Sequence, residues 1–531
     1  MLKTHYDVVI VGSGHNGLVA AAYLGGAGLS VLVLEANDYI GGATTSKRIF
    51  LDHDALLSRY SYLVSLFPTK IKDDLGLSFS TRRREVASFT PYVDSVGVDR
   101  GLVLSNVDTL RSQQSMEQLC GGTGAWKQYQ RFLELETAIA KMAWPSMLQP
   151  LRSREMFKSS LPDAEARAAW TSFVEAPLGD AIESHIDHDL LRGVLFTDAK
   201  IGVLTHPHDE SLLQNRCFLY HVIGQGTGEW QVPVGGMKSL VDSLVNCGAK
   251  NRVEYQIQSP VKRLIPGSKF QTIEFEIDGV LKHVDATHVL MNAAPSTLAR
   301  LVGRPWQPQA SDEGSVVKVN MLLKRLPTLK AVGVTSQEGF AGSLHINEGY
   351  DQMRQSYSEA VAGNLPSRPP YELYCHTLTD PSILSADLHA QGFQTLTLFG
   401  LDVPYRAFRT NHDERKHAIL QCYLDGLNQI CGESFESCLA QASDGSPCIE
   451  IKTPQELELE VGLDQGNIFH NAPSWFFTDD KNQTGRWGVE TEFEQILVAG
   501  SSAARGGAVS GIPGHNAAMC LFEKLGIQQP A

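Results

Sequence analysis

Two predominantly apolar runs open the chain, residues 6–11 and 31–34, and a segment of small residues separates them. Strands with little polar character are typical of a parallel sheet that is covered on both faces. Residues 17–26 between the two runs are rich in Gly, Ala and Leu and predict a helix. The chain therefore begins with a predicted β-α-β unit.

The same pattern returns in the middle and at the end of the chain. Further strands are predicted over residues 252–264, 272–276, 288–291 and 495–499, and helices over 235–245 and 513–524. A mostly helical, charged stretch (110–191) and partly alternating strands of a different sheet (316–323 and 395–401) interrupt this pattern. We predict an α/β fold in which a discontinuous Rossmann-type domain carries an inserted α+β domain with a helical portion. The predicted boundaries are 1–90, 230–300 and 460–531 for the first domain, and 91–229 and 301–459 for the second.

A glycine motif follows the first strand. Gly12 permits a tight turn, Gly14 lets the backbone approach a pyrophosphate, and Gly17 allows close packing of helix on strand. Glu35 lies 23 positions after Gly12, at the end of the second strand, where a carboxylate can accept hydrogen bonds from ribose hydroxyls. The predicted contacts of a dinucleotide in this motif are Gly12, Ser13, Gly14, Asn16, Gly17 and Glu35.

Two further segments indicate which dinucleotide is bound. The paired Gly41 and Gly42 suit a backbone that passes close to a second phosphate or a ribityl chain. Near the C-terminus, a Gly/Ser/Ala loop over residues 500–514 joins a strand to a helix with Pro513 near its first turn. Such a helix start can stabilise negative charge on the N1–C2=O edge of a reduced flavin. The further candidate contacts are Ala36, Gly41, Gly42, Ala43, Thr44, Gly500, Ser501, Ala508, Gly511 and Ile512.

Composition excludes several classes of function. The 531 residues carry a net charge of −14, so nucleic acid is not an expected partner. No apolar run approaches the roughly 20 residues of a membrane-spanning helix, and no leader sequence precedes the first strand. The nine cysteines are scattered without a Cys-x-x-Cys pair, which favours a reducing, cytoplasmic location and excludes a vicinal redox disulfide.

At these motifs the sequence resembles the flavoprotein oxidoreductases of the phytoene-desaturase type, over nearly the whole chain. It most resembles the branch named for pyridine nucleotide-disulfide oxidoreductase domain-containing protein 2. The matching segments are residues 12–23, 40–43, 61–65, 196–199, 235–237, 318–320, 345–347, 466–470 and 500–514. The resemblance implies an amine-oxidase/phytoene-desaturase-like fold and FAD, with Glu35 on the adenosine ribose, Gly41 and Gly42 near the pyrophosphate, and the backbone of Val261 at the adenine. Asn292 and Ala293, which end a strand, complete the expected cofactor contacts.

The chain departs from this family at three places. Gly500-Ser501 replaces the Gly-Asp of many relatives, so no carboxylate contact to the ribityl chain is expected here. Ala508 and Ala294 replace a common glycine and a frequent acidic residue. The disulfide chemistry in the branch name does not carry over, because no suitable cysteine pair exists. Residues 224–228 are predicted to be a plain loop, so no dedicated NAD(P)H site is expected.

Catalytic residues are not predicted. His206 and His208 lack a third metal ligand, so no metal is expected. Lys318 and three histidines are candidates for a flavin-facing pocket, although a structural role is favoured for each of them: His221, His345 and His470. An aromatic pair beside the flavin, as in amine oxidases, would have to come from Trp475, Phe476, Phe477 or Trp487, for which an ordinary core cluster is favoured.

We therefore predict an FAD-dependent oxidoreductase that transfers a hydride from an apolar small molecule, such as a polyene or lipid, to flavin N5. The reduced flavin would be reoxidised by oxygen, a quinone or another acceptor. Three alternatives stay open: a redox-neutral double-bond isomerase, an amine oxidase, and a non-catalytic, FAD-stabilised binding scaffold. The sequence leaves the oligomeric state and a peripheral membrane contact undecided.

Overall fold

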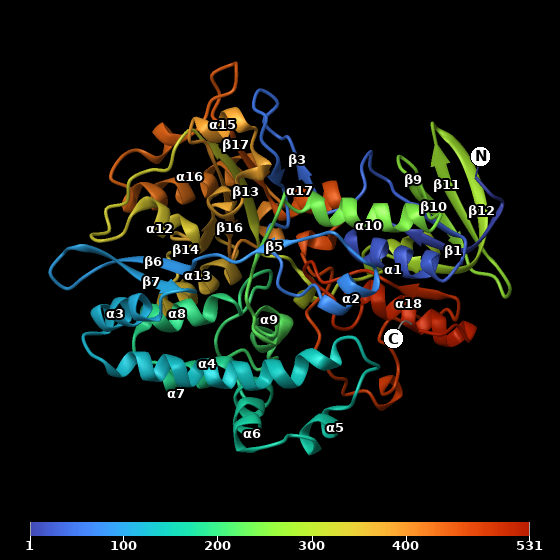
Figure 1. The fold of residues 1–531 in the computed structure, drawn as a ribbon, viewed down its shortest axis with the longest axis horizontal. Helices are drawn as coiled ribbons and strands as arrows, with labels where there is room; N and C mark the ends of the chain where they lie inside the picture. The colour runs from blue at the N-terminus through green and yellow to red at the C-terminus, as the bar shows by residue number, and fades with distance from the viewer. Residues whose placement is uncertain (1, 530–531) are drawn as a thin grey trace.

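The computed structural model describes residues 2–529 as two seven-stranded sheets and a layer of helices (Figure 1). In the first sheet the strand order is β10-β11-β12-β1-β2-β9, and β18 pairs with the end of β12. Its central strands run parallel, as expected for a Rossmann-type sheet. The strands are β1 His5–Val11, β2 Val31–Leu34, β9 Glu254–Gln256, β10 Val261–Ile265, β11 Gln271–Ile277, β12 Val280–Met291 and β18 Ile496–Val498.

Three helices cover one face of this sheet: α1 (His15–Gly26), α10 (Lys238–Lys250) and α18 (Ile512–Leu525). α1 packs against both of the others, and its small residues allow the close approach. The helix begins at His15, two residues earlier than predicted, because Gly14 serves as its N-cap. The predicted strand over 252–264 is also corrected. It is split into β9 and β10 at opposite edges of the sheet, because Gln258 is left-handed (φ 50°) and Pro260 has no N–H to donate.

The second sheet has the order β17-β13-β16-β15-β14-β6-β7 and is mostly antiparallel. One face packs against α16 (His412–Ile430), where the ring of Tyr423 lies edge-on against that of Tyr371. All seven residues of β13 are buried, so the alternation along this strand separates apolar from polar side chains rather than buried from exposed ones. The strands are β6 Val86–Val93, β7 Asp99–Ser105, β13 Val317–Leu323, β14 Ser343–Ile346, β15 Tyr371–Tyr374, β16 Gln394–Gly400 and β17 Ile449–Lys452.

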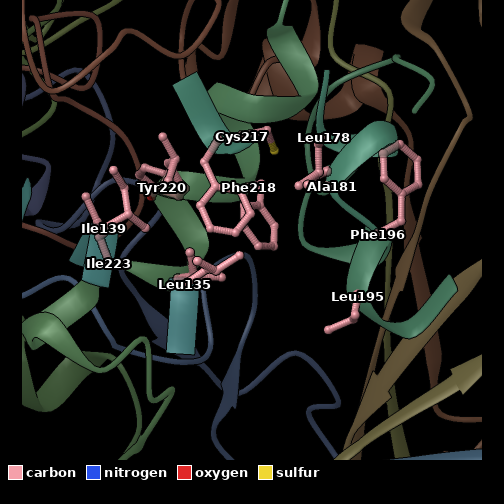
Figure 2. Packing of buried hydrophobic residues seen from close by; sticks show 14 of the residues in the cluster. Leu135, Ile139, Leu178, Ala181, Leu195, Phe196, Cys217, Phe218, Tyr220 and Ile223 are labelled. Carbon is pink, nitrogen blue, oxygen red and sulfur yellow. The ribbon is translucent and has the colours of Figure 1, made fainter. Parts of the chain in front are cut away.

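The helical portion forms the layer at the bottom of Figure 1 and has its own core. Figure 2 shows Phe218 of α9 beside Leu135 of α4, with Phe196 of α8 in the same cluster. The helices of this layer are α3 Thr109–Cys120, α4 Gly124–Ala143, α5 Arg154–Ser159, α6 Ala164–Trp170, α7 Leu178–His185, α8 Asp189–Thr197 and α9 Leu213–Val222.

Short elements connect these layers. The remaining helices are α2 Thr69–Asp74, α11 Pro295–Leu301, α12 Ser336–Ala341, α13 Tyr350–Val361, α14 His376–Thr379, α15 Ala386–Ala390 and α17 Pro454–Val461. The two small sheets pair β3 Ser46–Lys47 with β4 Leu57–Ser58, and β5 Thr81–Arg82 with β8 Val232–Pro233. Over residues 2–529, no helix combines the length and apolar character needed to cross a bilayer.

Candidate functional site

The glycine turn between β1 and α1 is held from the end of β12 by one side chain. Asn292 Nδ2 donates to the carbonyl oxygens of Gly12 (3.0 Å) and Gly14 (3.1 Å). Gly12 has a φ of +96°, and a Cβ added there would lie 2.5 Å from the Asn292 carbonyl oxygen. A Cβ on Gly17 would lie 2.6 Å from Asn292 Nδ2. The turn therefore requires glycine at both positions.

Glu35 points back from the end of β2 toward this turn. Its Oε2 accepts hydrogen bonds from the Ser13 backbone N (2.9 Å) and from Ser13 Oγ (2.6 Å), and its Oε1 accepts from the Asn37 backbone N (2.8 Å). These bonds fix a carboxylate beside the N-terminus of α1, where a phosphate and a ribose of one dinucleotide can be held together.

The second glycine pair crosses the first loop. Gly41 forms an isolated β-bridge with Gly14, and a Cβ on Gly42 would lie 3.3 Å from the Gly14 Cα. Both residues of the pair have positive φ, 121° and 56°. Thr44 Oγ1 lies 2.8 Å from His15 Nδ1 and joins the two loops. The backbone therefore passes close to the N-terminus of α1.

One cavity of about 950 Å³ connects this loop pair with the second sheet and the helical layer. Fourteen of the predicted cofactor contacts line it: Gly12, Ser13, Gly14, Asn16, Glu35, Ala36, Gly42, Ala43, Thr44, Val261, Asn292, Ala293, Ser501 and Ala508. The C-terminal loop thus reaches the same cavity, where Asn16 Nδ2 donates to Ser501 Oγ (3.4 Å).

The other five predicted contacts lie behind the cavity wall. Gly17 packs on Asn292, Gly41 packs on Val241, and the Gly500 backbone N donates to the Met291 carbonyl oxygen (3.2 Å). Gly511 is the left-handed N-cap of α18 (φ 69°), and Ile512 is fully buried. These residues shape the backbone of the site without lining it.

Polar atoms without partners mark where a ligand is expected. Among the described residues, His15 Nε2, Asn16 Oδ1 and His470 Nδ1 are buried without a hydrogen-bond partner, and all three side chains line the cavity. An unsatisfied buried polar group costs about 1–3 kcal/mol, so a ligand with several polar groups is favoured here. Burial lowers the pKa of His15 and that of His470 to about 4, so both imidazoles are neutral. The residues present fit a dinucleotide whose pyrophosphate meets the start of α1.

Comparison with known proteins decides the class. The model of the family described as flavin-containing amine oxidoreductase matches residues 17–372. The chain belongs to this family. An uncharacterised protein of Mycobacterium tuberculosis is 41% identical over 98% of this chain and 97% of its own length. The pyridine nucleotide-disulfide oxidoreductase domain-containing protein 2 of Rattus norvegicus is 29% identical over 99% and 94%.

The fold of this flavoenzyme is also found among solved structures. A crystal structure of an oxidoreductase from Methanosarcina mazei has a TM-score of 0.55 at 15% identity, and covers 97% of this chain and 99% of the other. The predicted family, α/β fold class, FAD cofactor and enzymatic character are confirmed. All nine cysteines are free, and none of them lines the cavity.

The inner end of the flavoenzyme's cavity is formed by a row of side chains across four antiparallel strands. Lys318 of β13 is paired with Phe399 of β16, Phe399 with Glu372 of β15, and Glu372 with His345 of β14. All four side chains line the cavity. Lys318 and His345, which the sequence offered as pocket candidates with a structural role favoured, both lie on the cavity wall together with His221 and His470.

Burial and the charges of neighbouring groups shift the pKa values of the ionisable side chains at this inner end. Burial, together with the charge of Glu348, raises the pKa of Glu372 to about 7. Burial and the neighbouring Asp198 raise the pKa of Glu136 to about 8. Burial holds the pKa of Lys318 well below its ordinary value. Groups that change charge near neutral pH are suited to handling protons or a polar substrate group.

Sequence reasoning missed several cavity residues: Arg84, Glu136, Asp198 and Glu372. Asp198 lies in the segment 196–199 that resembles the family but was not singled out as a site residue, and no motif marks the other three. All four come from separate elements that only the tertiary fold brings together. The only feature of the local sequence that indicated this end of the cavity was a charged residue within an apolar strand, namely Lys318.

Other candidates lie elsewhere. Trp475 and Phe477 stack at 5.4 Å in the helical-layer core and do not line the cavity, as the preferred core interpretation predicted. His208 Nε2 lies 2.9 Å from Glu183 Oε1, in a pair on the protein surface. Across residues 2–529, no cluster of His, Cys, Asp or Glu has the composition of a metal site. Residues 224–226 form a short 3-10 turn, and no helix begins directly after residue 228.

Proposed function

We propose that this flavoenzyme dehydrogenates a small organic molecule with an apolar body, which is bound between the FAD and the inner row of the cavity. The observation that carries the proposal is the continuity of one cavity from Glu35 to His345. We assign the cofactor to residues 1–90, 230–300 and 460–531, which contain all seven strands of the first sheet. Residues 91–229 and 301–459 form the proposed substrate domain.

Bound FAD supplies a two-electron acceptor that takes a hydride at N5. We assign the pyrophosphate to the backbone N–H groups between Gly12 and Gly17, the ribose to Glu35, and the adenine to the backbone of Val261. The start of α18, next to the cavity residues Ala508 and Val509, would face the N1–C2=O edge.

Apolar side chains of the cavity wall would hold the body of the substrate and exclude water. They come from the second sheet, from the helical layer and from the loop before residue 470: Leu104, Leu133, Val194, Leu195, Ile201, Phe399, Ile468 and Phe469. A water-free site strengthens every electrostatic contact that the reaction uses. We propose reoxidation by oxygen, a quinone or another soluble acceptor.

Amine oxidation is a second candidate. The carboxyl groups of Glu136, Asp198 and Glu372 line the cavity, and a cationic amine is a natural partner for such groups. The isomerase and scaffold alternatives differ from both oxidations in one respect, because neither predicts net reduction of the FAD by a metabolite. The cytoplasmic location stays a prediction.

An anaerobic titration tests the proposed function. Purified holoenzyme is mixed with fractionated lipid and metabolite extracts of its host, and the visible flavin absorbance is followed. We expect one fraction to bleach the flavin bands, and mass spectrometry of that fraction to reveal a product two hydrogens lighter than its substrate. Persistence of the bands against every fraction contradicts a dehydrogenase and favours the isomerase or the scaffold.

A further inference from the structure

Arg84 is a buried cation that lacks a carboxylate partner. Its residue is 8% exposed and lines the cavity, and within residues 2–529 no acidic oxygen lies within 4.0 Å of its guanidinium. Its Nε donates to the Trp230 carbonyl oxygen (3.3 Å), and its Nη1 donates to Ser343 Oγ (3.2 Å). Nη2 has no hydrogen-bond acceptor among the described residues. Because buried arginines are normally paired, the arrangement indicates an anionic ligand.

Arg84 lies beside the His345 end of the row. Ser343 precedes His345 by two positions on β14, so both side chains point to the same face of the sheet, and both line the cavity. The Arg84 guanidinium also lies 5.5 Å from the ring centroid of Tyr374, which follows Leu373, the cross-strand partner of Leu344. Arg84, Ser343 and His345 therefore face one common region of the cavity.

The orientation of His345 is fixed from behind. Its Nδ1 lies 2.5 Å from Glu348 Oε2, and the same oxygen lies 2.6 Å from Thr197 Oγ1. A carboxylate can only accept, so Nδ1 carries the hydrogen and Nε2 is the nitrogen left to face the cavity. Burial lowers the pKa of His345, but the Glu348 carboxylate more than compensates, and the resulting pKa lies above the ordinary value.

This region lies at the end of the row opposite Lys318. Lys318 Nζ lies 3.7 Å from the Tyr62 ring centroid, and the neighbouring Ser61 donates from Oγ to the Ala43 carbonyl oxygen (2.9 Å). Tyr62 also reaches toward the other end of the row, where its ring centroid lies 4.8 Å from that of Tyr374, so we take Lys318 as the flavin end of the row. Three inter-strand spacings of about 4.8 Å separate Lys318 from His345, so the backbones at the two ends of the row are about 14 Å apart. A substrate that reaches both ends must be elongated.

We propose that Arg84, Ser343 and His345 form a subsite for the carboxylate group of an elongated, otherwise apolar monocarboxylic acid. The planar guanidinium offers N–H donors in the geometry that carboxylates prefer, and Ser343 Oγ adds one donor. His345 Nε2 adds another when its ring is protonated, a form that the Glu348 carboxylate stabilises. The inference rests on the proposed function, which it deepens by naming the substrate class. The apolar wall then holds the chain, and the reacting carbon lies toward Lys318.

Acidic groups around the subsite make binding dependent on pH. Three carboxyl groups face this region: Glu372 of β15, Asp198 at the end of α8, and Glu348 behind His345. A fourth, Glu136 of α4, lies close enough to Asp198 that the charge of Asp198 raises the pKa of Glu136. Because the pKa of Glu372 is about 7, that side chain is neutral in mildly acidic solution and charged above neutrality. Affinity for a carboxylate is therefore expected to fall as the pH rises through neutrality.

Three probes with one chain length test the subsite: decanoate, decan-1-ol and decylamine. Their binding to the oxidised holoenzyme is measured by calorimetry and by the visible difference spectrum of the bound FAD, at pH 6 and pH 8. We expect decanoate to bind most tightly, and more tightly at pH 6 than at pH 8. Arg84→Gln should weaken decanoate binding about 10- to 100-fold, the worth of a charge-assisted hydrogen bond, and leave decan-1-ol nearly unaffected.

Matched variants separate recognition from folding. Arg84→Lys keeps the charge but loses the planar arrangement of N–H donors, and His345→Gln replaces a protonated imidazole by a neutral amide, so each should cause a smaller loss than Arg84→Gln. Arg111→Gln is the control, because Arg111 is paired with Glu338 and does not line the cavity. The FAD content and melting temperature of each variant establish that it is folded.

The proposal is overturned if decylamine binds most tightly, if none of the three probes binds, or if Arg84→Gln and Arg84→Lys both bind decanoate like the wild type. Failure of the proposed function is a separate result, because it appears as flavin that no extract reduces, whether or not decanoate binds.

Discussion

The two ends of the cavity differ in the groups that form them: mainly backbone atoms at one end and mainly side chains at the other. At the dinucleotide end, backbone groups and glycines define the site, and one side chain, Asn292, holds the turn through its bonds to Gly12 and Gly14. At the inner end, charged side chains from at least four elements converge, among them Lys318 and Glu372. The first end is specified locally along the chain, whereas the second end exists only in the folded protein. Cofactor class is therefore accessible from sequence motifs, and substrate class is not.

Substitution at Gly17 should break the dinucleotide end most severely. The Cβ of Gly17→Val would lie 2.6 Å from Asn292 Nδ2 and 2.8 Å from the Gly12 carbonyl oxygen. We expect loss of bound FAD and a decrease of about 2–3 kcal/mol in the free energy of unfolding, measured by visible absorbance and denaturant titration. Gly26→Ala is the control on the same helix, because its Cβ would have no neighbour closer than 3.6 Å. Full retention of FAD in Gly17→Val would contradict this assignment.

Removal of the Asn292 amide tests the clamp on the turn. Asn292→Ala loses both hydrogen bonds to the carbonyl oxygens of Gly12 and Gly14. We expect the free energy of unfolding to fall by about 2 kcal/mol and FAD to dissociate more readily, as followed by chemical denaturation and flavin fluorescence. A variant as stable as the wild type would show that the turn holds itself.

The dinucleotide end was predictable because its backbone conformation can be adopted only by certain residue types, which are visible in the sequence. Gly12 needs a positive φ and Gly17 needs the absence of a Cβ, and both needs appear as glycine at fixed spacing. The glycine pair at 41–42 and the loop at 500–514 could be placed for the same reason. Exact strand limits were less accessible, as the break at Gln258 and Pro260 shows.

The inner end could not be predicted, because nothing in the sequence links its members. Arg84 and Glu372 are separated by almost 300 positions, and neither belongs to a motif. Their meeting depends on the pairing of β14 with β15 and on the Arg84–Ser343 contact. Lys318 was visible as a charge in an apolar strand, but the sequence does not say which face of that strand meets a cavity.

A milder change at the dinucleotide end concerns the ribose. Glu35→Gln keeps the size of the side chain but removes its negative charge. The Ser13 N–H, the Ser13 hydroxyl and the Asn37 N–H all donate hydrogen bonds to this carboxylate. We expect the affinity for FAD to fall about tenfold, as a charge-assisted contact becomes a neutral one, measured by titration of apoprotein with FAD. An unchanged dissociation constant would remove Glu35 from the site.

The smallest expected effect lies at the inner end and depends on pH. The pKa of Glu136 in the folded protein is about 8, above its ordinary 4.5, so the folded state binds an extra proton between these values. The wild type therefore loses stability as pH rises from about 4.5 to 8, and Glu136→Gln does not incur this loss. The full shift corresponds to about 4–5 kcal/mol by linkage, and the partial exposure of Glu136 reduces this to on the order of 1 kcal/mol. The variant should therefore match the wild type near pH 4.5 and exceed it at pH 8 by about that amount, measured by denaturant unfolding.

The neighbouring Glu134 supplies the control for this measurement. Its side chain is 57% exposed on the same helix and is paired with Arg131. Glu134→Gln should show no comparable gain at pH 8. Equal pH profiles of Glu136→Gln and the wild type would show that Glu136 titrates like an ordinary surface carboxyl group.

A crystal structure of the FAD-loaded protein would show whether one cavity serves both cofactor and substrate. We expect the pyrophosphate at the start of α1 and the isoalloxazine ring between Ala43 and Lys318, with free space from the ring to Arg84. An isoalloxazine ring outside this cavity, or one that fills it as far as His345, would rule out a shared cavity.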